Sequence, residues 1–199
     1  MILFRNDDVS ANTNYLEMQE IYHTIKEYFP SSEILTCASI YCKRSPNFYK
    51  EGALYPDLPL KNRTNKYIYN ANAHVINDGR LTQTLVSHGL FHVKHGLLSE
   101  DAQEMSIVGS CRYLGTNKFV APFNSYNYIT EKVCLDNNIE LTTKKYDWKS
   151  LEHNDFDSSH KYWYFHSWRF NKQSFKEKLD GDISKRDSKQ LGQLQTNSY

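Results

Sequence analysis

Short apolar runs of strand length alternate along this chain with segments of helical periodicity, and no other feature constrains the fold as strongly. The runs predicted to be strands lie at 2–4, 33–41, 82–89, 118–122, 139–143 and 162–168. The predicted helices lie at 15–29, 100–114, 126–137 and 170–179. Because strands that alternate with helices pair mainly in parallel, the chain is predicted to form an α/β sheet or barrel.

Local signals place several of these boundaries. Pro30 follows the first helix and stops it. Ser99 is a good N-cap for the second helix, and Gly115 suits its C-terminus. Residues 43–66 hold three prolines among polar residues, so we expect a long loop there that forms one wall of a cleft. A turn or two of helix is predicted at 68–76.

The length and charge of the chain limit its organisation and its partners. The 199 residues are enough for one domain with a core, which we expect to span 1–180, followed by a polar tail at 181–199. With 24 basic and 23 acidic residues the net charge is +1. That balance gives no electrostatic reason to expect nucleic acid or an anionic membrane as a partner. The sequence leaves the oligomeric state open.

The cellular location is predicted from the first residues and the cysteines. No segment approaches the roughly 20 apolar residues of a membrane span, and charge appears by Arg5, so neither an integral membrane segment nor a secretory signal is expected. The four cysteines have no metal-type C-x-x-C spacing, and ordinary buried thiols are expected. Together these features predict a cytoplasmic protein.

Chemically active residues stand at the ends of several predicted strands. Asp7 and Asp8 end the first strand, His88 ends the third, Pro122 ends the fourth and His166 lies near the end of the last. In parallel α/β folds, sites form at the carboxyl ends of the strands. We therefore expect these residues to meet at one edge of the sheet.

Two histidines with helical spacing suggest a metal site. His88 and His92 are four positions apart, so on a helix or a tight strand-to-helix turn both side chains share a face. His95 is either a third neighbour or faces solvent. Two imidazoles and one carboxylate form a usual ligand set for a divalent metal such as zinc. The alternative, ordinary hydrogen-bonded histidines, loses weight because an acid pair ends an earlier strand.

The two adjacent aspartates can have different roles. Asp7 and Asp8 are adjacent, so on extended backbone their side chains point different ways. One can bind the metal while the other accepts a proton from a metal-bound water. The alternative is a cap for the helix that begins at Tyr15, which suits one aspartate better than two.

Three residues later in the chain have weaker signals. His166 would be the general acid for a leaving amine, or else a packed histidine. Asp147 would orient His166, or else belongs to a turn before a short helix. The amide of Phe123 would face a developing oxyanion, and the alternative is a turn with no other role.

Taken in order, these segments resemble the polysaccharide deacetylase (NodB-homology) superfamily, whose members remove acetyl groups from N-acetylated sugars. FRNDDVS resembles the first motif and HGLFH the second, while VAPFN, YDW and YFHSW resemble the third, fourth and fifth. The resemblance covers roughly residues 2–168 and implies a distorted, incomplete (β/α) barrel. It also implies that a divalent metal, zinc by expectation, is bound by Asp8, His88 and His92.

The same resemblance assigns the catalytic roles. Asp7 would be the general base and His166 the general acid, with Asp147 assisting His166 and Phe123 supplying the oxyanion amide. The chain departs from the family where the third motif usually begins with an arginine that braces the base, because Val120 and Ala121 stand near that point. The candidates to replace it in space are the basic residues Arg5, Lys94, Lys118 and Arg169. The first motif also lacks its usual glycine and has Val9 and Ser10 instead.

The function predicted from these features is metal-dependent hydrolysis of the acetyl group of an N-acetylated sugar or glycan precursor, with a metal-bound water as nucleophile. Inside the cell the substrate would be a precursor of a surface glycan. The 15 tyrosines and 10 phenylalanines would suit a sugar-binding cleft, although core packing is their commoner use. One alternative is a catalytically impaired accessory or glycan-binding protein. Another is a metal-dependent hydrolase of a different substrate on the same fold.

Overall fold

The strands of the protein form one parallel sheet. The computed structural model describes residues 1–9, 13–39 and 83–181. In chain order the strands are β1 (Leu3–Val9), β2 (Glu33–Ala38), β3 (Gln83–Ser87), β4 (Lys118–Phe119), β5 (Glu140–Leu141), β6 (Lys149–Ser150) and β7 (Tyr162–Phe165). Within the described ranges the order across the sheet is β5-β4-β3-β2-β1-β7-β6, and every pairing is parallel. The strands curl into an incomplete barrel, which confirms the predicted α/β fold class.

Helices connect the strands as the alternation in the sequence predicts. They are α1 (Tyr15–Tyr28), α3 (Glu100–Leu114), α4 (Tyr128–Asp136) and the short α5 (Thr142–Lys145), with 3₁₀ turns η1 (His95–Leu97), η2 (Pro122–Asn124) and η3 (Ser167–Arg169). Residues 172–181 are also helical. The predicted caps of α3 are confirmed, because the Ser99 side chain accepts a hydrogen bond from the Ala102 amide and Gly115 adopts φ 64°.

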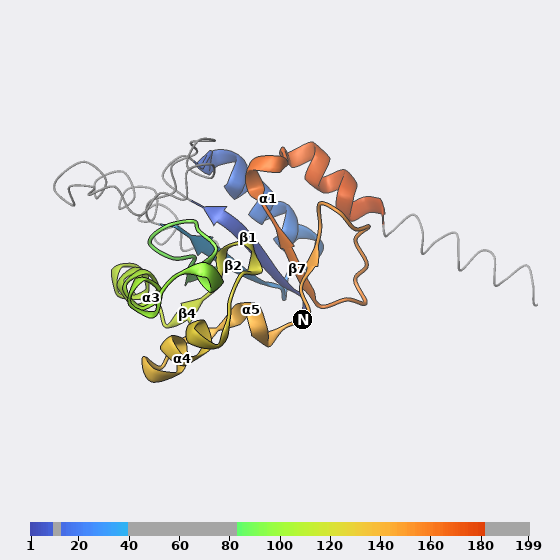
Figure 1. Cartoon of the computed structure of the whole chain (residues 1–199). Coiled ribbons are helices and arrows are strands. Elements are labelled where there is room, and N and C mark those ends of the chain that lie inside the picture. The colour runs from blue at the N-terminus through green and yellow to red at the C-terminus, as the bar shows by residue number, and fades with distance from the viewer. Residues whose placement is uncertain (10–12, 40–82, 182–199) are drawn as a thin grey trace, which may run out of the picture.

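The outer face of the sheet is covered by helices. One core cluster joins the apolar side of α1, including Ile21 and Ile25, to Phe4 of β1 and Ile34 of β2, and it also contains Phe175 of the last helix. Figure 1 shows α1 in blue and this last helix in orange-red on the same side of β1 and β7. A second cluster joins α3 and α4 to β4. These helices shield the outer face, so the inner face is left for the site.

The inner face of the curled sheet has its own apolar cluster. Its members come from alternate strand positions and from the segment after α5: Leu3, Leu35, Cys37, Val86 and Val120, with Tyr146, Trp148 and Tyr162 packed against them. Neighbouring residues such as Leu3 and Phe4 therefore face opposite sides of β1, as the two-residue period of a strand requires.

Several element boundaries differ from those predicted. The first strand does not stop at Phe4 but continues to Val9, because Arg5, Asn6 and Asp7 are buried polar residues whose side chains have partners. The strand predicted at 139–143 ends at Leu141, where α5 begins. The two-residue β6 was not predicted. The predicted loop at 43–66 and turn at 68–76 lie outside the described residues, as does the tail beyond 181.

The cysteines agree with the sequence expectation as far as the described residues go. Cys37, Cys111 and Cys134 are buried free thiols, as predicted, while Cys42 falls outside the described ranges. Among the helices that the structure describes, none has the length and apolar character required to cross a bilayer.

Candidate active site

The end of β1 brings two adjacent carboxylates to one place. The register between β1 and β2 shifts between Asn6 and Val9, and Asp8 adopts a left-handed backbone with φ 59°. This irregularity breaks the alternation that would send adjacent side chains to opposite faces. Asp7 is buried and 6% exposed, whereas Asp8 is partly open. A strained backbone at a non-glycine residue is typical of functional sites.

His88 follows β3 directly and its ring is fixed by the neighbouring chain. Nδ1 lies 2.8 Å from the carbonyl oxygen of Val120, which requires Nδ1 to carry the proton. The unprotonated Nε2 is then the nitrogen that faces Asp8, 3.3 Å from Oδ1. A hydrogen bond from the second ring nitrogen to a carbonyl is the usual way in which a metal-binding histidine is oriented.

His92 reaches the same carboxylate oxygen from a turn. Its Nε2 lies 2.6 Å from Asp8 Oδ1, and its ring centroid lies 5.1 Å from that of His88. Residues 88–94 are not helical, so of the two predicted geometries, helix and tight turn, the structure has the turn. Gly89 makes this turn with φ 85°.

These three side chains form a ligand set that suits a divalent cation. One donor atom from each of Asp8, His88 and His92 lies within 4.8 Å of the other two. Burial alone would raise the pKa of Asp8, but hydrogen bonds and charge interactions with His88 and His92 outweigh it and hold the pKa well below its usual range. Two imidazole nitrogens and an ionised carboxylate are the donors preferred by zinc and similar metals.

His95 neither faces the metal ligands nor faces solvent. It is completely buried, with Nδ1 3.0 Å from the carbonyl oxygen of Val93 and Nε2 2.9 Å from Ser106 Oγ. Burial lowers its pKa from 6.5 to about 4. Both of its ring nitrogens are therefore used in packing beneath the site, which corrects the two roles considered for it from the sequence.

His166 stands on the other side of Asp8 and is held by Glu152. The Nδ1 atom of His166 is 2.5 Å from Glu152 Oε1, which also accepts a hydrogen bond from the His166 amide at 2.9 Å. The Nε2 atom of His166 lies 3.5 Å from Asp8 Oδ2. Burial lowers the pKa of His166, but Glu152 together with Asp7 and Asp8 outweighs that effect and raises it.

Glu152 has the position that was predicted for Asp147. Asp147 is exposed, and its backbone carbonyl accepts a hydrogen bond from His160 Nε2 at 2.9 Å. The prediction that Asp147 contacts His166 is therefore corrected. Glu152 itself is almost buried and also pairs with Arg169 Nε at 3.2 Å. Nothing in the spacing of Glu152 and His166, which are 14 residues apart, signals their contact.

The turn after β4 adjoins the metal ligands. Phe123 and Asn124 both have left-handed backbone conformations, with φ 58° and 51°. The Asn124 amide donates to the Ala121 carbonyl at 3.0 Å, and the Ala121 amide donates to Thr143 Oγ1 at 2.7 Å. The Phe123 ring is 4.5 Å from the His92 ring, so this turn borders the site. An oxyanion role for the Phe123 amide stays a prediction.

Arg5 is the basic residue that reaches Asp7. Its Nη2 donates to Asp7 Oδ2 at 2.8 Å and to Asn124 Oδ1 at 3.0 Å. The guanidinium carbon lies 4.7 Å from the centroid of the Trp148 ring and 4.9 Å from that of Tyr164. Arg5 was one of four candidates in the sequence, and the two-residue strand period, which places residues 5 and 7 on one face, could have singled it out.

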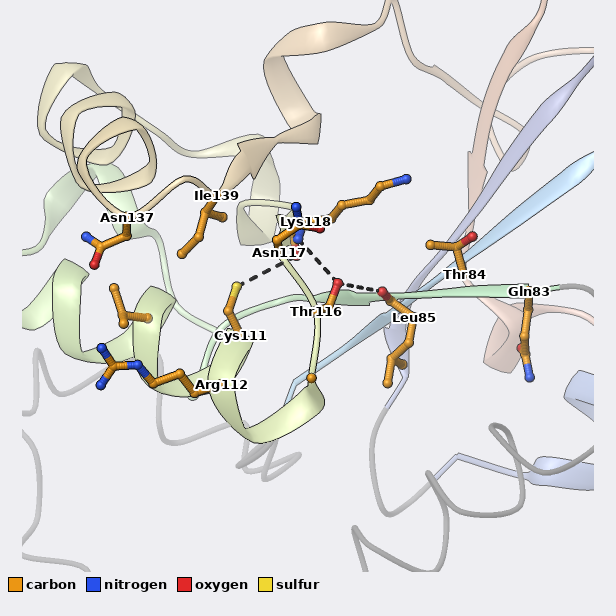
Figure 2. A pocket seen from close by; sticks show the side chains of 12 residues that line it. Gln83, Thr84, Leu85, Cys111, Arg112, Thr116, Asn117, Lys118, Asn137 and Ile139 are labelled. Atoms are coloured by element: carbon orange, nitrogen blue, oxygen red, sulfur yellow. Dashed lines mark hydrogen bonds between the residues drawn. The ribbon is translucent and has the colours of Figure 1, made fainter.

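A separate cavity of about 710 Å³ lies at the opposite edge of the sheet. Its lining includes Gln83 and Lys118, the first residues of β3 and β4, whereas the site lies at the carboxyl ends of β1, β3 and β7. Figure 2 shows the side chains of Arg112 and Asn137 at this cavity. None of the predicted metal ligands or catalytic residues lines it, and Lys118, one of the four basic candidates, lies here rather than at the site.

Comparison with solved structures identifies the fold. No protein-family model matches the sequence, and no curated protein matches it either. A family 4 carbohydrate esterase from Streptomyces lividans, solved with acetate, covers 93% of this chain and 88% of its own at 8% identity and a TM-score of 0.59. The peptidoglycan deacetylase PdaC from Bacillus subtilis covers 98% of this chain and 92% of its own at 9% identity, with a TM-score of 0.53.

A third similar structure is that of a pseudoenzyme. It is a family 4 pseudoenzyme from Bacillus anthracis, which covers 94% of this chain and 61% of its own at 12% identity, with a TM-score of 0.57. The chain thus has the fold of family 4 carbohydrate esterases and peptidoglycan deacetylases. The fold implied by the motifs that resemble polysaccharide deacetylases is confirmed. Because active enzymes and a pseudoenzyme share this fold, activity has to be argued from the site.

Proposed function

We propose that the protein is a metal-dependent hydrolase that removes the acetyl group from an N-acetylated sugar or glycan precursor. The observation that carries this proposal is the arrangement around Asp8. Its Oδ1 faces Nε2 of His88 and of His92, and its Oδ2 faces Nε2 of His166. The Asp8 carboxylate thus lies between two histidines that can bind a metal and a third histidine that can carry a proton.

The donor set supports a divalent cation held by Asp8, His88 and His92, and Zn²⁺ is the metal that we propose. When bound, such a cation would supply Lewis-acid activation of water and of the acetyl carbonyl group. The orientation of His88 by the Val120 carbonyl, which leaves Nε2 unprotonated, favours this role over that of an ordinary core histidine.

The other residues are placed for the two proton transfers of amide hydrolysis. Asp7 would accept a proton from the attacking water as the water oxygen bonds to the carbonyl carbon. When the carbon–nitrogen bond breaks, the Nε2 proton of His166 would pass to the amine nitrogen, so that acetate and a free amine leave. Glu152 accepts from Nδ1 and so keeps the proton to be donated at Nε2.

Exposed aromatic rings beside the site support a sugar substrate. Phe123 is 48% exposed next to His92, and Trp168 is 41% exposed with its ring 5.5 Å from that of His166. Aromatic rings of this kind can pack against the apolar face of a sugar. The similar structures point the same way, since one was solved with acetate and another is a peptidoglycan deacetylase.

The test combines metal analysis with acetate release. The zinc-loaded protein is incubated with N-acetylglucosamine pentamer, and bound zinc and released acetate are measured. We expect Asp7→Asn to retain zinc and lose turnover, whereas His88→Ala loses both. His23→Ala, which alters an exposed histidine on α1, is the matched control and should retain both. Near-normal turnover in Asp7→Asn would show that Asp7 is not the base.

Two observations favour the accessory alternative. A pseudoenzyme shares the fold, and Val120 and Ala121 replace the expected arginine segment. Bound zinc without acetate release from any acylated sugar would favour that alternative. Release of a different product from another class of substrate would favour the other alternative, a metal-dependent hydrolase of a different substrate on the same fold. The cytoplasmic location stays a prediction.

A further inference from the structure

Arg5 is a fully buried cation at the base of the candidate site. It lies on the inner face of β1, with the rings of Trp148 and Tyr164 each within 5 Å of its guanidinium carbon. Removing a guanidinium from water is costly, so its position needs compensating interactions. Asp7 supplies the opposite charge, through a 2.8 Å contact between Nη2 and Oδ2.

Stability of the fold alone does not explain this ion pair. The Nε and Nη1 atoms of Arg5 are buried and have no hydrogen-bond partner among residues 1–9, 13–39 and 83–181. Buried ion pairs stabilise a fold only when their remaining donors are also satisfied, and apolar residues of the same size often do better. The arrangement therefore requires a reason other than packing, and the geometry around Asp7 provides one.

We propose that Arg5 is a positioning residue for the general base and for the oxyanion turn together. This inference rests on the proposed function. By holding Asp7 Oδ2, Arg5 fixes the orientation of the carboxylate that would accept the proton from water. The other oxygen, Oδ1, is buried and accepts no hydrogen bond from a nitrogen or oxygen atom of the described residues, so Arg5 supplies the charge-assisted contact that orients this carboxylate.

The same Nη2 atom also fixes the turn that follows β4. It donates to Asn124 Oδ1 at 3.0 Å, and Asn124 and Phe123 both have the left-handed conformation that non-glycine residues adopt only when their surroundings hold them. One guanidinium group thus connects the strand that carries the base to the turn that carries the Phe123 amide. This contact therefore links the position of the base to the position of the turn.

The experiment uses the zinc-loaded full chain and N-acetylglucosamine pentamer, with kcat, KM and bound zinc as readouts. Arg5→Met removes the charge at similar volume, and we expect kcat to fall about 100-fold with KM and zinc content little changed. Asn124→Gly removes the amide while permitting the positive φ, and should lower kcat less. The control is Arg112→Met on the exposed end of α3, which should match the wild type.

A merely structural role is distinguished by combining variants. If Arg5 acts through Asp7 and Asn124, then Arg5→Met should not lower the residual kcat of a variant that carries both Asp7→Asn and Asn124→Gly any further. A kcat for Arg5→Met within twofold of wild type, or a full additive loss when Arg5→Met is added to that variant, would overturn the proposal. If Arg5→Met does not fold, Arg5→Lys takes its place in the same cycle, because it keeps the charge but loses the planar fork.

Failure of the proposed function would look different. If the zinc-loaded wild type releases no acetate, the deacetylase proposal fails, and the positioning of Asp7 is then read from crystals of the zinc-loaded wild type and Arg5→Lys. A changed side-chain torsion of Asp7 in the variant supports the positioning role. An unchanged torsion contradicts it.

Discussion

The buried state of His95 leads to a quantitative prediction about stability and pH. Its Nδ1 donates to the Val93 carbonyl, and its Nε2 accepts from the Ser106 hydroxyl, which in turn accepts from the Leu90 amide at 3.1 Å. This network fits the neutral ring, and protonation would place a second donor opposite a hydroxyl in a buried site. His88 and His92 are the charged or titratable neighbours that add to the effect.

The size of the effect follows from the two pKa values. The pKa of His95 is about 4 in the folded protein, against 6.5 for the unperturbed group. At about 1.4 kcal/mol for each pH unit, the difference corresponds to roughly 3 kcal/mol of folding free energy. Because the folded pKa is the lower one, the unfolded chain takes up the proton first as the pH falls. The contribution is therefore complete above pH 6.5 and is lost between pH 6.5 and 4.

The assay is urea unfolding of wild type and His95→Gln at pH 7 and pH 5. Between these values the wild type should lose about 2 kcal/mol more stability than the variant, in which this group no longer titrates. His23→Gln is the control, since His23 is exposed on α1 and its replacement should leave the pH dependence as in wild type. An equal loss in wild type and His95→Gln would refute the reasoning.

Three further predictions concern the site. Glu152→Gln keeps the shape of the side chain but removes the charge that holds His166. The kcat for acetate release should therefore fall about 10- to 100-fold with zinc retained. An unchanged kcat would exclude a positioning role for Glu152. Gly89→Ala places a methyl group 2.8 Å from His95 Cε1 at a φ of 85°. Urea unfolding should therefore show a free energy of unfolding that is lower by about 1–3 kcal/mol. A decrease smaller than the error of the fit would contradict the expected strain. Trp168→Ala should raise KM for the sugar pentamer and leave kcat nearly unchanged. Leu135→Ala, which removes an exposed apolar side chain from α4, should alter neither.

The parallel fold could be predicted because its longest elements have clear patterns. The apolar spacing in α1 and the caps of α3 are local signals, and the structure contains both helices. The strands β4, β5 and β6 each have two residues, too few for a period to be recognised. Their positions depend on pairing with neighbouring strands rather than on their own sequence.

The length of β1 was underestimated for a different physical reason. A prediction from hydrophobicity treats polar residues as exposed, so it ends the strand at Phe4. Arg5, Asn6 and Asp7 are nevertheless buried, because each has a partner from a distant segment or from the strand itself. A hydrophobicity pattern fails at such buried polar residues, because they are kept in the strand by their hydrogen bonds and by the needs of the site.

The candidate site also contains some residues that could be predicted from the sequence and others that could not. Asp8, His88 and His92 were found because they stand at strand ends with a spacing that metal ligands favour, and the structure brings all three together. Glu152 was missed because it lies between two short strands, and its contact with His166 exists only after folding. Asp147 was chosen for its place in a motif, but the backbone leaves its side chain exposed.

Zinc titration of the metal-free full chain by calorimetry is the most direct test of the cation site. The wild type should bind one zinc ion per chain, and Asp8→Asn, His88→Ala and His92→Ala should each weaken or abolish that binding. His95→Gln should bind as the wild type does, because its ring nitrogens are occupied elsewhere. A wild type that takes up no zinc, or a His92→Ala variant that binds it equally well, would contradict the account.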